Sequence, residues 1–513
     1  MRTLTFLLLV VSSSLACLPS PLPPLDGGDG DGDGDGDDDD DDIVVGDGDG
    51  DGDGDGDGDG DGDGDGDGDG DGDGDGDGDG DGDGDGDGDG DGDGDGDGDG
   101  DGDGDGDGDG DGDGDGDGDG DGDGDGDGDG DVTTTVRVHY DVGLGNSMAI
   151  RGSGGGLSWE ENVGAEWTPG NVWQWSSTTV TAPIEWKPVF VHPNGAISWP
   201  NGANWRVSPG ETVDVYPFFF STTGRLVEFQ MTSSALGETR TVTVYLPPSY
   251  DELGAYARTY PVLVMHDGQN LFDPFAIQGG WGLVSSLDDL FVHSQIVDDE
   301  GVRATGGVRE VIVVGAWNTA DRILDYTPTN GSYGACDATV SVCGGHADDY
   351  LDFVEDELLP RVATDFRTDG ARVGIAGSSL GGLVSLYACW TRPESFDRCG
   401  VFSPSLWWDE EFIVELIDDD TGPKRDIAIA MDVGTVSDGM DNVLVLDGIL
   451  TNKPIDQAYV PSVDYQCVIG TGHAHNEPAW RARSPYAIDF LYADETRVDV
   501  APPFASDVAP CAP

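Results

Sequence analysis

One serine in this chain lies where a reactive hydroxyl could be presented. Ser379 is at the centre of Gly-Ser-Ser-Leu-Gly (377–381), between a strand-like run and a helix-like run. A G-x-S-x-G pattern in that context predicts a sharp strand-to-helix turn that lifts the serine oxygen above the edge of a sheet. The flanking glycines permit such a strained turn. The alternative is an ordinary serine that caps the helix, a position that Ser378 fills equally well.

A nucleophilic serine needs a base and commonly an acid that orients the base, and both residue types follow Ser379 along the chain. His475 and His473 lie between the last predicted strand and the last predicted helix. Three aspartates end or follow the preceding predicted strand: Asp432, Asp438 and Asp441. The order serine, acid, histidine is the order of nucleophile-elbow enzymes. These placements predict acyl transfer through a covalent serine intermediate.

Strand-like and helix-like segments alternate from about residue 225 to residue 497. Apolar runs predict strands at 240–250, 260–268, 309–318, 371–379, 398–405, 425–434 and 464–470, the last of which would end the sheet. Helix-spaced apolar residues predict helices at 281–296, 349–366, 380–390, 443–452 and 479–494. The alternation predicts an α/β fold with a doubly wound, mostly parallel sheet.

Several longer motifs in this domain carry a family resemblance. They are YPVLVMHDGQNLFD (260–273), NTADRILDYTP (318–328), ADDYLDFVEDELLPRVATDFRT (347–368), GSSLGGLVSLYACW (377–390), VFSPSLWW (401–408) and HNEPAWR (475–481). On these motifs the domain resembles the "Putative esterase" family of α/β-hydrolases, which includes siderophore esterases and secreted feruloyl and acetyl-xylan esterases. The resemblance implies an α/β-hydrolase fold and a serine esterase that needs no cofactor. It makes Ser379 the nucleophile and His475 the base, with His473 as the second candidate.

The same resemblance implies an acid at Asp438. This residue matches the aspartate of the Gly-Thr-x-Asp pattern in feruloyl-esterase relatives, with one extra residue in the spacing. Asp432 and Asp441 compete with it, and some siderophore esterases of the family use only a Ser–His pair.

The oxyanion would be held by the backbone N–H of Leu380 and by that of Gln269, with Gly268 as the alternative. His266 is expected either to be merely buried or to take part in catalysis. Trp407 and Trp408 either line the substrate pocket or pack in the core.

Residues 132–220 have a different composition, with short strand-like segments at 132–142, 171–180, 184–191 and 211–220. Gly, Pro and Asn turns separate them, which predicts a small all-β sandwich. Tryptophans are dense in this domain: Trp159, Trp167, Trp173, Trp175, Trp186, Trp199 and Trp205. Core packing alone would not need so many, and flat aromatic faces suit the C–H surfaces of sugars.

Four motifs in this domain resemble the starch-binding carbohydrate modules of family 20: AIRGSGGGLSWEE (149–161), NVWQW (171–175), IEWKPVFV (184–191) and ISWPNGANWRV (197–207). The resemblance implies that Trp159 and Trp199 stack on glucan, with Lys187 and Asn204 nearby. Two positions depart from the family pattern, at Trp186 and Trp205. A structural accessory sandwich is the alternative.

Residues 26–131 are almost pure Asp-Gly, broken by an aspartate run and by IVVG at 43–46, and contain no basic residue. The tract contributes much of the formal net charge of −84. Glycine adds no side chain to bury and the aspartates repel one another, so the tract is predicted to be a disordered, extended linker. A two-residue repeat lacks the ligand spacing of a calcium site. The acidic balance excludes nucleic-acid binding and charge-driven binding to anionic lipid.

The segment 1–17 has an early arginine, a short apolar run and small residues before Cys17, which predicts an export signal. Leu-Ala-Cys resembles a bacterial lipoprotein box, which implies a lipid on Cys17; plain secretion after cleavage near Ala16 is the alternative. The expected location is the bacterial cell surface or outer membrane, or else the periplasm or medium. Any membrane contact would be through that lipid.

The six remaining cysteines predict disulfides in an exported chain. Proximity in sequence pairs Cys336 with Cys343 and Cys389 with Cys399, which leaves Cys467 with Cys511, although fifteen pairings are open. None of these cysteines has the spacing of a zinc site, so no metal is predicted.

The sequence therefore predicts an exported serine esterase that acts on acylated or feruloylated carbohydrate. A hydrolase of siderophores or other small esters, an acyltransferase, and a non-catalytic surface carbohydrate-binding protein remain the alternatives.

Overall fold

The computed structural model describes residues 132–274, 276–298, 300–331, 343–498 and 503–511. The segment 1–17 with Cys17, the Asp-Gly tract 26–131, and Cys336 lie outside these residues.

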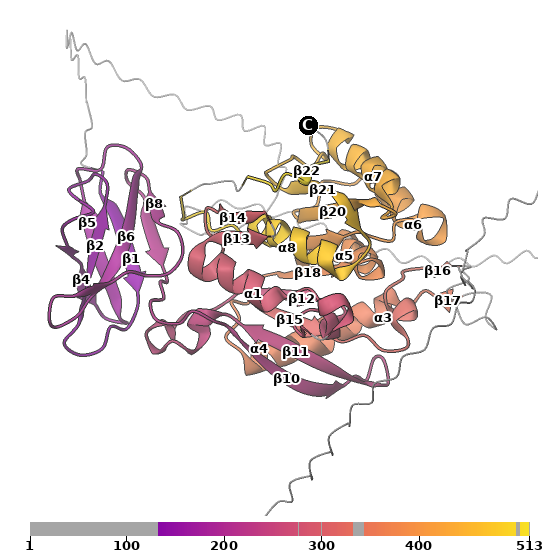
Figure 1. Ribbon diagram of the computed structural model, residues 1–513, viewed down its shortest axis with the longest axis horizontal. Coiled ribbons are helices and arrows are strands. Elements are labelled where there is room, and N and C mark those ends of the chain that lie inside the picture. Colours follow the sequence, from indigo (N-terminus) through magenta and orange to yellow (C-terminus); the bar gives the residue numbers. More distant parts are fainter. Residues whose placement is uncertain (1–131, 275, 299, 332–342, 499–502, 512–513) are drawn as a thin grey trace, which may run out of the picture. The chain divides into compact units, whose positions relative to one another are not determined.

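The first part of the described chain consists of short strands in two sheets (Figure 1). Its strands are β1 (Thr134–His139), β2 (Ser147–Gly152), β3 (Val163–Gly164), β4 (Glu166–Thr168), β5 (Val172–Ser177), β6 (Ile184–Val191), β7 (Ile197–Ser198), β8 (Trp205–Val207) and β9 (Thr212–Val215). One sheet has the order β4-β5-β1-β9; the other has the order β3-β2-β6-β7, with β8 also paired to β6. Successive side chains of β1 point to opposite faces of the sheet, so Val136 and Val138 are buried and Arg137 between them is exposed. Side chains from both sheets share one hydrophobic core.

The second part is built on a nine-stranded sheet with the order β10-β11-β15-β12-β18-β19-β20-β21-β22. Its strands are β10 (Arg225–Thr232), β11 (Thr239–Leu246), β12 (Val262–Met265), β15 (Ile312–Ala316), β18 (Val373–Ser378), β19 (Phe396–Phe402), β20 (Ala428–Val436), β21 (Tyr465–Ala474) and β22 (Val508–Pro510). The strands from β15 to β21 in this order are parallel, whereas the pairs β10–β11, β11–β15 and β21–β22 at the two edges are antiparallel. The mostly parallel sheet predicted from the alternation is therefore confirmed.

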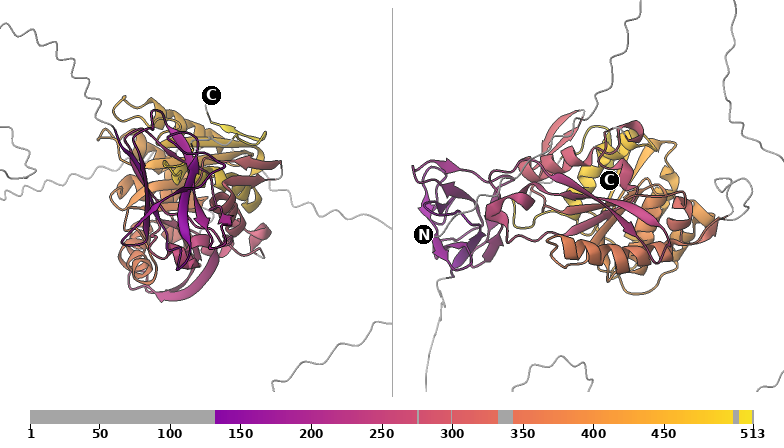
Figure 2. Two further views of the ribbon diagram at one scale, coloured as in Figure 1. Left: turned by 90° about the vertical axis from the view of Figure 1, so that its left-hand side faces the viewer. Right: turned by 90° about the horizontal axis from the view of Figure 1, so that it is seen from below.

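Helices cover the sheet, and two small hairpins lie outside it (Figures 1 and 2). The α-helices are α1 (Leu283–Asp288), α2 (Arg322–Asp325), α3 (Ala347–Asp352), α4 (Leu359–Asp365), α5 (Leu380–Thr391), α6 (Trp408–Asp418), α7 (Met440–Asn452) and α8 (Glu477–Leu491). Short 3-10 helices are η1 (Pro248–Asp251), η2 (Leu253–Ala255), η3 (Gly268–Asn270) and η4 (Ile277–Gly279). The π-helical segments are η5 (Asp289–His293) and η6 (Phe353–Leu358). The hairpins are β13 (Gln295–Asp298) with β14 (Gly301–Ala304), and β16 (Asn330–Gly331) with β17 (Cys343–Gly344).

The continuous apolar runs of the parallel strands are explained by burial on both faces of the sheet. In β12, Val262 and Val264 join a core made with α3 to α7, whereas Leu263 and Met265 join a second core made with α1, η5 and α8. Both α1 and α8 accordingly lie on one face of the sheet (Figure 1). The result is a layer of strands between two layers of helices.

The direction of the chain reverses within this sheet. From β12 the chain passes to β15 on one side and then returns to β18 on the other side of β12. Open α/β sheets bind ligands at the carboxyl edge beside such a reversal. The loops that follow β12 and β18 lie at that edge, and they carry residues 266–270 and Ser379.

The sheet continues beyond the end at residue 497 that the sequence predicted, and 464–470 does not end it. Val508–Pro510 pairs antiparallel with β21 as the strand β22, and Cys511 forms a disulfide with Cys467 of β21. The predicted disulfide Cys389–Cys399 is also confirmed. The pairing predicted for Cys343 involves Cys336, which lies outside the described residues.

Candidate active site

Ser379 lies on a strained turn between β18 and α5. Its φ of 60° and ψ of −122° are a conformation that L-residues other than glycine rarely adopt. Although Ser379 occupies the N-cap position of α5, its side chain makes no capping hydrogen bond. The turn is held by its backbone, because the N–H of Ser379 donates to the Phe402 carbonyl at 3.0 Å and its own carbonyl accepts from Ser405 N–H at 3.0 Å. The helix-cap alternative therefore does not explain this serine.

The glycines of the motif are needed because another residue lies directly beneath the turn. A Cβ atom on Gly377 would lie 2.8 Å from His266 Cδ2, and one on Gly381 would lie 3.3 Å from His266 Cβ. His266 is 1% exposed, and its Nδ1 lies 2.8 Å from the Tyr350 hydroxyl. Desolvation by burial lowers the pKa of His266 to about 3, so the ring is neutral at physiological pH. This geometry favours a packing role for His266 under the elbow.

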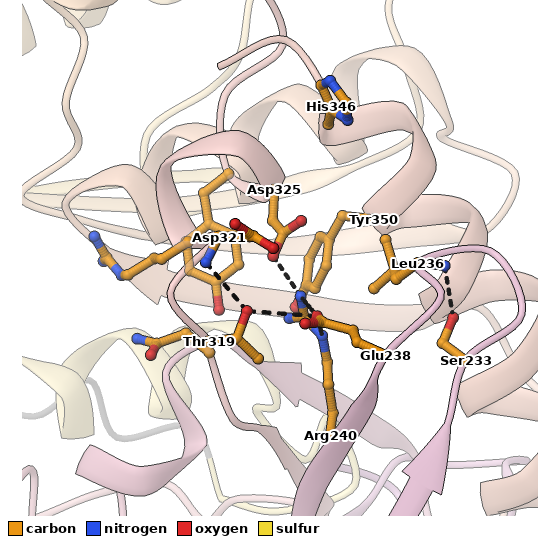
Figure 3. Close-up of polar contacts among 12 residues, drawn as sticks. Ser233, Leu236, Glu238, Arg240, Thr319, Asp321, Asp325, His346 and Tyr350 are labelled. Atoms are coloured by element: carbon orange, nitrogen blue, oxygen red, sulfur yellow. Dashed lines mark hydrogen bonds and ion pairs between the residues drawn. The ribbon is translucent and has the colours of Figure 1, made fainter. Parts of the chain in front are cut away.

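A buried ion pair fixes Tyr350 on its other side (Figure 3). The guanidinium of Arg240 extends from β11 between Glu238 and Asp325, bonds to both carboxylates, and lies 5.4 Å from the centre of the Tyr350 ring. Arg240 is fully buried, and a buried cation requires such partners. The contacts extend from β11 and α2 through Tyr350 to His266, so a continuous series of buried contacts lies beneath the elbow.

His475 follows β21, in the loop that leads to α8. Its Nδ1 lies 2.6 Å from Asp438 Oδ1 in the loop after β20. The Asp438 side chain is fully buried, whereas the His475 side chain is 37% exposed. Because an ionised carboxylate can only accept, Nδ1–H donates to Asp438 and leaves Nε2 as the basic nitrogen. Asn476 caps α8 by accepting from Ala479 N–H at 3.1 Å, which fixes the end of this loop.

The other two aspartates that the sequence offered have different surroundings. Asp432 is buried and pairs with Arg483 at 3.0 Å, and Asp441 is exposed at the start of α7. Of the three, Asp438 is the one that contacts His475.

His473, the second candidate base, has both ring nitrogens engaged. Its Nε2 lies 3.1 Å from Asp507 Oδ2, and its Nδ1 lies 3.2 Å from a nitrogen of Arg483. These contacts suit a residue that shapes the loop.

A buried polar network that the sequence analysis missed surrounds the acid. Asp438 Oδ2 accepts from the Ser403 hydroxyl at 2.7 Å and from the Gly434 N–H. Arg483 is fully buried; it donates to the Ser403 oxygen at 2.8 Å and to Asp432 at 3.0 Å, and lies 3.5 Å from Asp438. A signal was available, because Arg483 lies three residues after Trp480 on the apolar side of a predicted helix. A buried arginine there requires buried carboxylates.

The predicted oxyanion donors flank the elbow. The N–H of Leu380 is at the start of α5, and Gln269 lies in η3, which follows β12 beside β18. Neither N–H has a hydrogen-bond acceptor among the residues that the structure describes. Gly268 packs against β15, and Asp267 has a φ of 58° and binds Arg322 through two bonds of 2.8 and 2.7 Å. These contacts fix the loop that carries Gln269.

The two tryptophans after β19 have different environments. Trp408 is 1% exposed, its indole N–H donates to the Thr329 carbonyl at 3.0 Å, and it belongs to the core. Trp407 is 40% exposed. Trp407 is therefore the one of the two whose side chain reaches the surface.

In the N-terminal sheets, Trp159 and Trp199 lie side by side, with ring centres 6.3 Å apart. Trp199 is 41% exposed, and Arg151 braces the pair by donating to the Trp159 carbonyl and lying 5.4 Å from the Trp199 ring. Lys187 and Asn204, expected nearby, are bonded internally, to the Gly202 carbonyl at 2.7 Å and to Glu185 at 2.6 Å. Burial lowers the pKa of Lys187 to about 8.

Trp186 and Trp205, which depart from the family pattern, are buried with ring centres 5.8 Å apart. Both therefore serve the core.

Across the described ranges, no group of three or more His, Cys, Asp or Glu is arranged to hold a metal ion. None of the helices that the structure describes is both long enough and apolar enough to span a membrane.

Comparisons with known proteins place this chain beside proteins described as esterases. A family model described as "Putative esterase" matches residues 233–485, which include Ser379, Asp438 and His475. The chain is 30% identical over 173 residues to a siderophore triacetylfusarinine C esterase of Aspergillus fumigatus, a match that covers 34% of this chain and 53% of that protein. It is 26% identical over 223 residues to an endo-1,4-beta-xylanase/feruloyl esterase of Xylanibacter ruminicola, covering 42% of this chain and 26% of that protein. The chain thus spans about half or less of the length of these curated relatives.

Among solved structures, an IroE-like serine hydrolase from Shewanella oneidensis is 23% identical, with a TM-score of 0.39 and coverage of 52% of this chain and 80% of that one.

Proposed function

We propose that this chain hydrolyses carboxylic esters through a serine acyl-enzyme, with Ser379 as nucleophile, His475 as base and Asp438 as acid. The observation that carries the proposal is the Asp438–His475 bond of 2.6 Å at the same edge of the sheet as the uncapped, positive-φ Ser379. That pair prepares a basic Nε2, and the elbow presents a hydroxyl.

In the proposed reaction, Nε2 of His475 takes the Ser379 proton while Oγ attacks the ester carbonyl carbon. The N–H groups of Leu380 and Gln269 donate to the oxygen that becomes negative. His475 then gives the proton to the departing alcohol. Next, His475 deprotonates a water molecule, which attacks the acyl-enzyme and releases the acid and Ser379.

The substrate class we propose is acylated or feruloylated carbohydrate. The adjacent Trp159 and Trp199 rings support it, since they offer an exposed aromatic surface braced by Arg151. The Xylanibacter ruminicola relative, which is described as an endo-1,4-beta-xylanase/feruloyl esterase, supports it as well. A siderophore ester is the second candidate, favoured by the Aspergillus fumigatus relative, which is described as a siderophore triacetylfusarinine C esterase.

Export is also part of the proposal. The bonds Cys389–Cys399 and Cys467–Cys511 support it, because disulfides persist in oxidising compartments.

An ester panel tests the function. Wild type and Ser379→Ala are assayed with acetylated xylan, methyl ferulate, a catecholate siderophore ester and p-nitrophenyl acetate. The proposal expects turnover by wild type that Ser379→Ala loses, with the feruloyl or acetyl-xylan substrate preferred. Preference for the siderophore supports the second candidate, and turnover that survives in Ser379→Ala contradicts the mechanism.

A further inference from the structure

One turn of the chain contacts both ends of the proposed catalytic set. Ser403, Pro404 and Ser405 follow β19 directly and precede α6. The Ser403 hydroxyl donates to Asp438 Oδ2 at 2.7 Å. Two residues later, the Ser405 hydroxyl lies 3.3 Å from the Ser379 hydroxyl, and the Ser405 N–H donates to the Ser379 carbonyl at 3.0 Å. The turn thus places one hydroxyl on the acid and another on the nucleophile.

The Ser405 hydroxyl is held with little freedom. Ser405 is 2% exposed, and among the described residues its hydroxyl has no hydrogen-bond partner other than Ser379 Oγ. The backbone before it is fixed by the φ of 40° at Ser403 and by the ring of Pro404. A buried hydroxyl with a single partner contributes through that partner.

The chemistry of the two oxygens decides which of them donates. The Ser379 proton must point to Nε2 of His475 if it is to be transferred there, and this leaves the lone pairs of Ser379 Oγ as acceptors. Ser405 is then the donor. We infer that Ser405 is a positioning residue that donates a hydrogen bond to Ser379 Oγ; the inference rests on the proposed function. It restrains the rotamer of the nucleophile and stabilises the negative charge that grows on Oγ.

The proton count stays simple. The Ser379 proton moves to His475, and Ser405 keeps its own proton throughout, so Ser405 is not a second base. When the acyl-enzyme breaks down, the electrons of the broken acyl–oxygen bond return to Ser379 Oγ, His475 returns to this oxygen the proton that it took from water, and the Ser405 hydroxyl donates to it again. Both acylation and deacylation therefore gain from this bond.

The test measures the reactivity of Ser379 directly, with a small covalent reagent in place of an ester substrate. Wild type, Ser405→Ala and Ser405→Thr are treated with a small fluorophosphonate, and the rate constant for formation of the Ser379 adduct is followed by mass spectrometry. Ser385→Ala is the matched control, because Ser385 is fully buried on α5 and its hydroxyl bonds to the Gly381 carbonyl rather than to a reacting group. Steady-state kinetics with p-nitrophenyl acetate are measured in parallel.

Loss of a hydrogen bond to a developing charge predicts that Ser405→Ala lowers the rate constant by about tenfold or more. The same factor is expected in kcat with KM little changed, whereas Ser405→Thr recovers part of the rate and Ser385→Ala keeps that of wild type. A purely structural role would not be expected to lower kcat while leaving KM unchanged. Nor would it be expected to allow rescue by threonine, the other residue with an aliphatic hydroxyl. If Ser405→Ala does not fold, Ser405→Cys replaces it, since it fills the site with a side chain of the same shape whose thiol is a weaker donor.

A rate constant for the hydroxyl-deleted variant equal to or above that of wild type overturns the inference, as does a loss of equal size in the Ser385 control. If Ser405→Ala reacts as fast as wild type and wild type is labelled at Ser379, the inference is wrong but the proposed function is retained. Absence of labelling in wild type overturns the proposed function, and the inference with it.

Discussion

Asp438 and His475 are joined by a bond of 2.6 Å between Oδ1 and Nδ1, and the second oxygen of Asp438 is held by Ser403 and Gly434. The carboxylate therefore cannot rotate without losing several hydrogen bonds. A fixed carboxylate fixes the orientation and the tautomer of the imidazole, which leaves Nε2 free to accept a proton.

Replacing this acid tests its role. Asp438→Asn is expected to lower kcat for p-nitrophenyl acetate by about 10³- to 10⁴-fold, because an amide can donate to Nδ1 and so favour the wrong tautomer. Asp441→Asn is the control, since Asp441 is exposed and is expected to leave kcat unchanged. Equal activity of the two variants would mean that a Ser–His pair is sufficient.

The buried Arg483 is expected to matter for stability as well as for geometry. Arg483→Met leaves Asp432 and Asp438 buried without their cation, which predicts a loss of about 3–5 kcal/mol in the free energy of unfolding. Urea denaturation measures it. The double variant Arg483→Met with Asp432→Asn removes one unpaired charge and should recover part of the loss. An effect below about 1 kcal/mol in the single variant would contradict this account of the network.

His266 predicts a particular dependence of stability on pH. Its pKa in the folded chain is about 3, below the ordinary value of about 6.5, so the unfolded chain binds the proton more readily. The contribution of His266 is complete above about pH 6.5 and decreases by up to about 1.4 kcal/mol per pH unit as the pH falls toward 3. His266→Gln should therefore flatten the unfolding free energy between pH 6 and pH 4.

The exposed His346 provides the comparison for that experiment. His346→Gln is expected to keep the wild-type slope. If His266→Gln keeps that slope too, the ring is not held neutral in the folded chain.

The tryptophan pair of the N-terminal domain predicts glycan binding. Trp199→Ala removes an exposed ring beside Trp159, and we expect it to weaken binding to insoluble starch by about 10- to 30-fold in a depletion assay. Trp167→Ala is the matched control. Trp167 is also an exposed tryptophan, at 51%, but it lies on β4 away from this pair in sequence, so its replacement is expected to leave starch binding unchanged. If insoluble starch removes no wild-type protein from solution, the prediction that this domain binds starch is wrong.

Much of the second domain could be predicted because its signals are local. Apolar runs predicted seven strands of the large sheet, β11, β12, β15, β18, β19, β20 and β21, and Gly-Ser-Ser-Leu-Gly marked the turn at Ser379. The edge strands were harder: β10 has the alternating burial of a strand exposed on one face, and β22 is only three residues long. The predicted helix at 349–366 is found as the run α3, η6 and α4.

The site itself divides in the same way. Residue type and chain order singled out His475 and offered three aspartates, but only the fold shows which of them contacts the ring. Ser403, Ser405 and Arg483 were missed because their partners are distant in sequence: Ser403 and Asp438, for example, are separated by 35 positions. Trp407 and Trp408 look alike as a dipeptide, and only packing against Gly331 and Gly344 distinguishes the buried one.

The central claim is that Ser379 is a nucleophile activated by His475. The most direct measurement is covalent labelling of the intact chain with a fluorophosphonate, followed by peptide mapping. The account predicts one adduct, on Ser379, that is absent in Ser379→Ala and forms at least about 10²-fold more slowly in His475→Ala. No adduct on Ser379, or an adduct that forms at the same rate without His475, would contradict it.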